Sequence, residues 1–160
     1  MTIKIGDRIP SVTLHHMTGE GPAEIATEAL FGGKRVAVFG MPGAFTPTCS
    51  AKHLPSYAAA AGSFKAKGVE TIACVSVNDA FVMDAWGKDQ NVGGKVMMIA
   101  DGSGDFCRAI GLELDLSERG FGIRSQRYSM LVEDGVVTAL HVEEPGAFAV
   151  SDAETLLGDA

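Results

Sequence analysis

The sequence of 160 residues has little cysteine and no long apolar run. Its three cysteines, Cys49, Cys74 and Cys107, are too few and odd in number for the disulfide framework of a secreted domain, so at least one is a free thiol. No apolar run reaches the roughly 18 residues of a membrane span, and residues 1–7 have no signal-peptide core. These absences predict a cytoplasmic protein that does not associate with membranes.

Positive charge is also scarce, because 13 Lys and Arg residues face 20 Asp and Glu residues, for a net charge of -7. This balance argues against binding to nucleic acid or to an anionic membrane, but it leaves room for a local basic site. Hydrophobic residues make up 46% of the chain, which is typical of a packed globule. Without a linker or a shift in composition, residues 1–160 are expected to form a single domain.

Apolar and turn-forming segments follow one another in the order of an α/β fold. Near-continuous apolar runs are typical of strands covered on both faces, and an Asp-Gly pair between two runs predicts a hairpin. Strands are expected at residues 35–41, 69–77, 96–100, 127–132 and 136–142, and helices at 50–61, 79–88, 104–110 and 151–157. This order predicts a thioredoxin-type fold, with a central mixed sheet flanked by helices and preceded by an extended N-terminal segment.

Some local features are less decisive. Residues 23–30 fit either a strand or a helical turn, and the charged residues 111–122 fit no regular element. Asn78 is expected to cap the helix that follows it. Ser151 stands three residues before Glu154, which is the spacing of a capping box.

The most informative stretch is Pro-Gly-Ala-Phe-Thr-Pro-Thr-Cys at residues 42–49. The Thr46 hydroxyl is expected to cap a helix by accepting from a backbone N–H one turn on, and Pro47 suits the first helical position. Cys49 then lies in the first turn, where free N–H groups and the helix dipole favour negative charge. A reactive thiolate is therefore predicted, and an inert buried cysteine is the alternative.

The two neighbours of this cysteine each have two interpretations. Thr46 either caps the helix alone or also orients the thiolate or a bound oxygen substrate. Pro42 either ends the preceding strand or shields the sulfur from water, since its fixed φ and missing N–H hold the loop.

Pro42, Thr46 and Cys49 stand in the Pro-x-x-x-Thr-x-x-Cys pattern of the peroxiredoxins. Residues 40–50 resemble the peroxiredoxin-5 (type II) subfamily of these thiol peroxidases in particular. Further matches follow in chain order at residues 73–79, 101–104, 111–115 and 124–130. The resemblance covers about the whole chain and implies a thioredoxin fold with peroxiredoxin additions.

The resemblance also implies the roles of the site residues. The Cys49 thiolate, the peroxidatic cysteine, would attack the terminal oxygen of a hydroperoxide, release water or an alcohol and become a sulfenic acid. Thr46 would hydrogen-bond the substrate oxygen, and Pro42 would limit solvent access. The family arginine matches Arg127, whose fixed charge would stabilise both thiolate and substrate. Arg124 is expected to support the loop or a nearby carboxylate.

The thiol that resets Cys49 is less evident. Cys74 lies in an apolar strand, where an inert buried thiol is favoured. Some relatives have been proposed to join this cysteine to the peroxidatic one, which would need local unfolding. Cys107 is not expected in most relatives, and the C-terminal resolving cysteine of the animal members has no counterpart. A one-cysteine cycle is therefore favoured, in which glutathione, glutaredoxin or thioredoxin supplies the resolving thiol.

Partners and cofactors complete these expectations. His53 follows Cys49 by four residues, but no further ligand cluster accompanies the pair, so core packing or an interface hydrogen bond is expected and no metal or other cofactor. The resemblance implies a homodimer that uses the loop of Phe45. Phe121 and Leu116 either form an apolar collar suited to alkyl hydroperoxides or belong to a plain surface loop.

Two other functions are alternatives to a peroxidase. A thioredoxin-like dithiol exchanger would need cysteine where Thr46 stands. A peroxide-sensing redox switch or a holdase-like binding protein could use the same Cys49, but it would react once per subunit rather than turn over.

Overall fold

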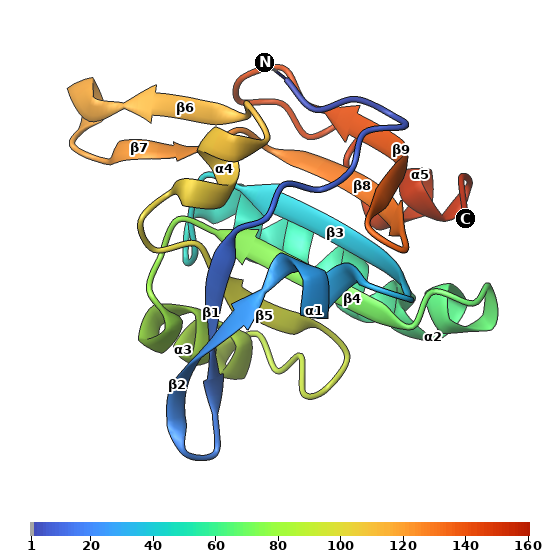
Figure 1. Cartoon of the computed structure of the whole chain (residues 1–160). Coiled ribbons are helices and arrows are strands. Elements are labelled where there is room, and N and C mark those ends of the chain that lie inside the picture. The colour runs from blue at the N-terminus through green and yellow to red at the C-terminus, as the bar shows by residue number, and fades with distance from the viewer. Residues whose placement is uncertain (1) are drawn as a thin grey trace.

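The computed structural model describes residues 2–160. A seven-stranded sheet has the order β2-β1-β5-β4-β3-β8-β9, and a separate two-stranded sheet, β6-β7, extends beyond it (Figure 1). The strands are β1 Thr13–Thr18, β2 Gly21–Ala26, β3 Arg35–Met41, β4 Thr71–Ser76, β5 Met97–Ala100, β6 Glu113–Leu116, β7 Gly122–Ser125, β8 Tyr128–Glu133 and β9 Val136–Val142. The helices are α1 Thr27–Phe31, the π-helix η1 Cys49–His53, α2 Leu54–Ala66, α3 Ala80–Asp89, α4 Asp105–Ala109, the 3-10 helix η2 Ser117–Arg119 and α5 Ala153–Leu157.

The central strands of the large sheet are parallel. β3 and β4 pair from Val36 opposite Thr71 to Met41 opposite Ser76, and β5 continues the parallel set on the far side of β4. The β8–β9 hairpin adds antiparallel strands beside β3, and β1 and β2 do so beside β5. The predicted mixed α/β sheet, with a parallel core and antiparallel edges, is confirmed.

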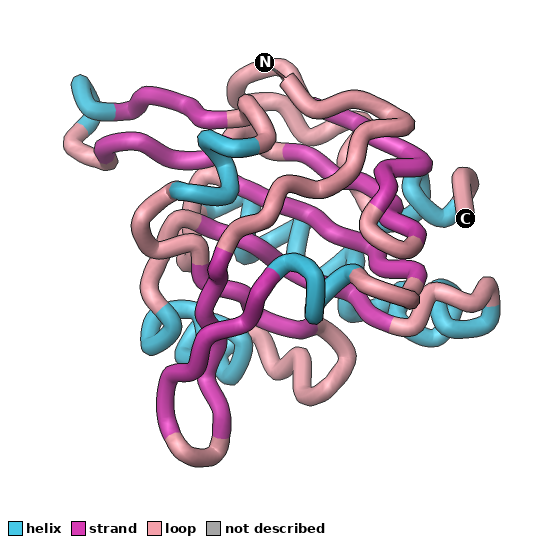
Figure 2. The backbone as a smooth tube through the Cα atoms, viewed as in Figure 1, coloured by secondary structure: helices cyan, strands magenta, loops and turns pink. Residues whose placement is uncertain are grey.

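Helices and loops cover both faces of this sheet. Along β3, Phe39 and Met41 face one layer, which contains α2, α3 and α5, whereas Val36 and Val38 face the other. That second layer contains α1, α4 and the N-terminal loop, which crosses in front of the sheet before β1 begins (Figures 1 and 2). Burial on both faces explains why the strand at residues 35–41 is almost wholly apolar.

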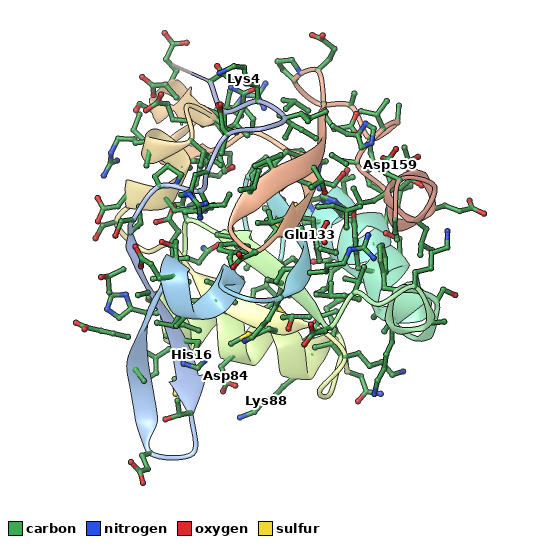
Figure 3. The ribbon with its side chains drawn as sticks, turned by 45° about the vertical axis from the view of Figure 1, so that its right-hand side comes forward. Lys4, His16, Asp84, Lys88, Glu133 and Asp159 are labelled. Atoms are coloured by element: carbon green, nitrogen blue, oxygen red, sulfur yellow. The ribbon has the colours of Figure 1, made fainter. Side chains whose placement is uncertain are left out.

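Charged side chains form ion pairs on the surface outside these layers. On α3, Lys88 and Asp84 point toward each other and form an ion pair of 2.9 Å one helical turn apart (Figure 3). Within residues 2–160, no helix has both the length and the apolar character needed to span a membrane.

Two expectations about local structure are wrong. Residues 111–122 contain β6, η2 and the first residue of β7, rather than being irregular throughout. Asn78 does not cap α3, because the Asp79 carboxylate accepts from the Val82 N–H instead. The Asn78 side chain accepts from the N–H of Ala44 at 3.0 Å, so it ties the loop after β3 to the end of β4.

The cap expected at Ser151 is also displaced by one residue. Asp152 caps α5 by accepting from the Thr155 N–H, and the Ser151 hydroxyl donates to Glu143 at 2.7 Å instead. The ambiguous residues 23–30 form both elements in turn, since β2 ends at Ala26 and α1 follows at once.

Candidate active site

The site begins where the parallel strand β3 ends and the chain turns into a helix. Pro47 starts the helical stretch, as predicted. The cap predicted for Thr46 is wrong, because within residues 2–160 no backbone N–H donates to its hydroxyl, which instead donates to the Gly43 carbonyl at 2.8 Å within the tight loop. With its proton committed to Gly43, the Thr46 oxygen keeps its lone pairs free to accept a hydrogen bond.

Cys49 opens a π-helical turn rather than an α-helical one. The Leu54 N–H donates to the Cys49 carbonyl, which is five residues back. Pro55 follows at once and has no N–H to donate to the Ala51 carbonyl, so the regular α-helical ladder cannot run through this point. Such π-turns are rare and occur frequently at functional sites.

The sulfur of Cys49 is fully buried beside a cation. Arg127 Nη2 donates to Cys49 Sγ at 3.1 Å. Arg127 directly precedes β8, and the pairing of Tyr128 with Gly40 of β3 holds it next to the loop. A guanidinium hydrogen-bonded to sulfur favours negative charge there. The sheet register therefore brings together two residues that are 78 positions apart.

His53 is the second partner of this arginine. Arg127 Nη1 lies 2.8 Å from His53 Nδ1, and His53 Nε2 lies 3.1 Å from the Ser151 carbonyl. Burial, together with the charge of Arg127, lowers the pKa of His53 to about 3, so the imidazole is neutral near pH 7. The core packing expected for His53 is confirmed, since its buried ring lies against Phe39 and Tyr57. The contact with Arg127 was not predicted, although the Cys-x-x-x-His spacing placed the cysteine and the histidine on one helix face.

Arg124 has a different task. Its Nε donates to the Phe121 carbonyl at 2.9 Å, and its Nη1 lies 3.3 Å from the Pro42 carbonyl and 3.4 Å from the Val77 carbonyl. A Cβ at Gly43 would come within 2.9 Å of the same nitrogen, so Arg124 lies close against the backbone of the loop. Arg124 thus supports the loop that carries Pro42, in the manner expected from the sequence.

A small pocket of about 90 Å³ opens beside Pro42 and Arg127, and neither Cys49 nor Thr46 lines it. Its lining residues come from the Pro42 loop, the start of the helix, β6 and the segments on either side of the β8–β9 hairpin: Pro42, Thr48, Leu114, Gln126, Arg127, Glu143, Glu144, Pro145 and Gly146. A volume of this size holds a few water molecules, so it suits a small polar substrate.

The other two thiols are buried and unlinked. Cys74 lies on β4 in the same layer as Cys49, and burial, with the nearby charge of Cys49, raises its pKa well above the ordinary value. Cys107 lies on α4, which covers the opposite face of the sheet, and burial followed by the charge of Asp101 raises its pKa to about 12. Neither thiol is disposed to ionise. Among residues 2–160, no group of three or more His, Cys, Asp or Glu side chains could hold a metal ion.

Comparison with known proteins matches this geometry to a family. A family model described as Redoxin matches residues 4–157. Peroxiredoxin-2E, chloroplastic, from Arabidopsis thaliana is 47% identical over 98% of this chain and 68% of its own length. In solved structures, peroxiredoxin 5 from Alvinella pompejana has a TM-score of 0.87 and 36% identity, covering 98% of this chain and 97% of that one. The chain is a peroxiredoxin of the peroxiredoxin-5 (type II) subfamily.

A third relative of this peroxiredoxin is also a solved structure. Reduced Prx3 from Vibrio vulnificus, solved in complex with hydrogen peroxide, has a TM-score of 0.94 and 52% identity, covering 98% of each chain. The expected thioredoxin fold with peroxiredoxin additions is confirmed by these neighbours. The protein is accordingly a thiol peroxidase that reduces peroxides.

Proposed function

We propose that this peroxiredoxin reduces hydrogen peroxide and alkyl hydroperoxides at Cys49. The observation that carries the proposal is the hydrogen bond of 3.1 Å from Arg127 to the Cys49 sulfur. The thiolate attacks the terminal oxygen, the O–O bond breaks, and the sulfur loses two electrons to become a sulfenic acid. The leaving oxygen takes a proton and departs as water or an alcohol.

Each neighbour has a part in this step. Arg127 stabilises the charge that moves from sulfur to the leaving oxygen. The free lone pairs of Thr46 accept from the O–H of the peroxide and align it, since its own proton is given to Gly43. Pro42 lines the pocket and limits the access of water, and backbone N–H groups in the first turn at Cys49 add to the binding of the substrate.

We propose a one-cysteine cycle for recovery. A thiol from glutathione, glutaredoxin or thioredoxin condenses with the sulfenic acid to give a mixed disulfide and water, and a second thiol releases Cys49. The raised pKa values of Cys74 and Cys107 argue against either one as the resolving nucleophile. The cycle and the identity of the reductant are proposals, as is a cytoplasmic location.

Exposed aromatic side chains support two further proposals. Phe45 is 51% exposed at the tip of the active-site loop, where an apolar ring in solvent suits contact with a second copy in a homodimer. Phe121 is 53% exposed next to β7, and with the half-buried Leu116 it would favour the alkyl chain of a larger hydroperoxide.

Substitution of the three cysteines tests the proposed cycle. Cys49→Ser should abolish repeated peroxide turnover, while Cys74→Ser and Cys107→Ser should keep it, with glutathione–glutaredoxin and thioredoxin each supplied as donor. Peroxidase activity retained in Cys49→Ser would overturn the assignment. A single oxidation per subunit in the unsubstituted protein, with no turnover from either donor, would instead favour a redox switch.

A further inference from the structure

The segment that follows β9 returns to the active site. Phe148 packs against the His53 ring, with the ring centroids 5.1 Å apart, and lies 5.9 Å from the Arg127 guanidinium carbon. Glu143 starts this segment and is only 5% exposed. The path of residues 143–151 therefore decides what lies against His53 and Arg127.

The Glu143 carboxylate holds this segment in place. It accepts from the backbone N–H groups of Ala149, Val150 and Ser151 at 2.8–3.0 Å and from the Ser151 hydroxyl at 2.7 Å. Burial alone would raise the pKa of Glu143, but the hydrogen bonds from Ser151, Ala149 and Val150 hold it below the ordinary value. The Glu143 N–H also donates to the Arg127 carbonyl at 2.9 Å. One residue thus binds both the backbone of the arginine and the segment that faces it.

The Ser151 carbonyl connects the segment held by Glu143 to the His53 imidazole. It accepts from the Tyr57 hydroxyl at 2.8 Å and faces His53 Nε2 at 3.1 Å. Because a carbonyl oxygen can only accept, Nε2 carries the proton of the neutral ring. Nδ1 then offers its lone pair to Arg127 Nη1 at 2.8 Å. The opposite tautomer would set one N–H against another.

The guanidinium is the last member of the series. Its five N–H donors lie in one rigid plane, so an acceptor on one nitrogen fixes the direction of the others. With Nη1 bonded to His53, Nη2 is directed at Cys49 Sγ. A continuous series of contacts therefore runs from the Glu143 carboxylate to the reactive sulfur.

We propose that Glu143 is a positioning residue for peroxide reduction, which fixes the Ser151 carbonyl, holds His53 in its Nε2–H tautomer and so directs Arg127 at Cys49. This inference rests on the proposed roles of Cys49 and Arg127. Glu143 does not react with the peroxide; it acts through Ser151, His53 and Arg127, the three residues between it and the sulfur.

Glu143→Gln tests the first link, since it keeps the shape but removes the charge and turns an amide N–H₂ toward backbone donors. We expect the second-order rate constant for hydrogen peroxide to fall about tenfold. Glu133→Gln is the matched control, because Glu133 is exposed at the end of β8 (Figure 3) and should keep the full rate. An unchanged rate in Glu143→Gln would overturn the proposal.

The same Glu143→Gln substitution in an Arg127→Lys background separates an effect on the position of Arg127 from a structural disturbance of the site that does not act through Arg127. A lysine has no planar fork for His53 to direct, so Glu143→Gln should then cost less than about twofold. An equal loss in both backgrounds would overturn the positioning role and leave the proposed chemistry intact. A full rate in Arg127→Lys alone would overturn the role of the arginine, and the positioning proposal with it.

The tautomer can also be read from the unsubstituted protein by two-bond ¹H–¹⁵N correlation of the His53 ring. We expect the Nε2–H form near pH 7 in the unsubstituted protein and in Glu133→Gln, and a loss of that preference in Glu143→Gln. An Nδ1–H tautomer or an imidazolium in the unsubstituted protein would overturn the proposal even if Glu143→Gln failed to fold.

Discussion

A single arginine side chain, Arg127, contacts both the cysteine sulfur and the histidine ring at the site. One nitrogen of Arg127 contacts a sulfur and the other contacts a neutral imidazole. Most histidines in solvent would be partly charged near their ordinary pKa of 6.5, and a charged ring here would repel the guanidinium. The lowered pKa of His53, about 3, therefore keeps the ring neutral, so that Arg127 can contact both the ring and the sulfur.

The buried His53 should make stability depend on pH in a defined window. In the unfolded chain the ring takes up a proton below about pH 6.5, whereas in the folded protein it stays neutral down to about pH 3. The unfolded state thus binds more protons in this window, and the free energy of unfolding should fall as the pH falls, by up to about 1.4 kcal/mol per pH unit from this group.

Urea unfolding at several pH values between 7.5 and 4.5 measures this effect, with His53→Gln as the comparison. The glutamine can still accept from Arg127 and donate to Ser151, but it does not titrate. The stability advantage of the unsubstituted protein over His53→Gln should shrink as the pH falls. A difference that stayed constant with pH would contradict a buried neutral histidine.

At the scale of strands and helices, β3 contributes buried side chains to the core and leads directly into the loop of the site. Gly40 lies near its end, where the Tyr128 ring packs directly on the backbone, and an added Cβ would come only 2.2 Å from that ring. Gly62, in the middle of α2, has open space at the same position. Glycine is therefore needed at position 40, where a side chain would meet the Tyr128 ring, but not at position 62, although both positions lie inside regular elements.

Alanine at these two positions should have opposite effects. Gly40→Ala forces the buried ring aside and should lower the free energy of unfolding by about 1–3 kcal/mol. Gly62→Ala meets nothing and should raise it by roughly 0.5–1 kcal/mol, since glycine is a poor residue for a helix interior. Urea denaturation of both variants checks the pair. A stabilised Gly40→Ala would show that Tyr128 does not need this contact.

Patterns local in sequence account for the elements that were predicted well. The run at residues 35–41 is buried on both faces, and Asp134 and Gly135 have positive φ in the turn between β8 and β9, as an Asp-Gly hairpin requires. The β6–β7 hairpin was missed because its strands have four residues each, are only partly buried and pair only with each other.

The site was predictable only where its residues share a motif. Cys49, Thr46 and Pro42 stand close together in the chain, and the resemblance supplied Arg127. The contact between His53 and Ser151 joins residues 98 positions apart, and no sequence spacing predicts it. Glu143 was missed for the same reason, since its partners are backbone N–H groups that only the folded loop turns toward it.

For the whole molecule, the large sheet separates the cysteines into two groups. Cys49 and Cys74 share the layer of α2, α3 and α5, whereas the helix of Cys107 lies on the other face. Cys74 is fully buried within its strand. Disulfide formation between Cys49 and Cys107 would therefore require part of the fold to open, while the raised pKa of the buried Cys74 thiol disfavours its attack on Cys49.

Peptide mapping after one equivalent of peroxide tests this separation. With glutathione present, mass spectrometry should find a mixed disulfide at Cys49 and free thiols at Cys74 and Cys107. An internal Cys49–Cys74 link should appear only when denaturant is added before the oxidant. Peptides joined through Cys49 and either other cysteine under native conditions would contradict the one-cysteine cycle.

The long intervals within the site also matter during synthesis. A ribosome makes Cys49 well before Arg127, which follows 78 residues later, and His53 waits 98 residues for the carbonyl of Ser151. Domains fold as units once enough of the chain has emerged. A nascent chain therefore carries Cys49 before Arg127 exists to donate to its sulfur, and the site is assembled only after the last strands and the segment behind them have been made.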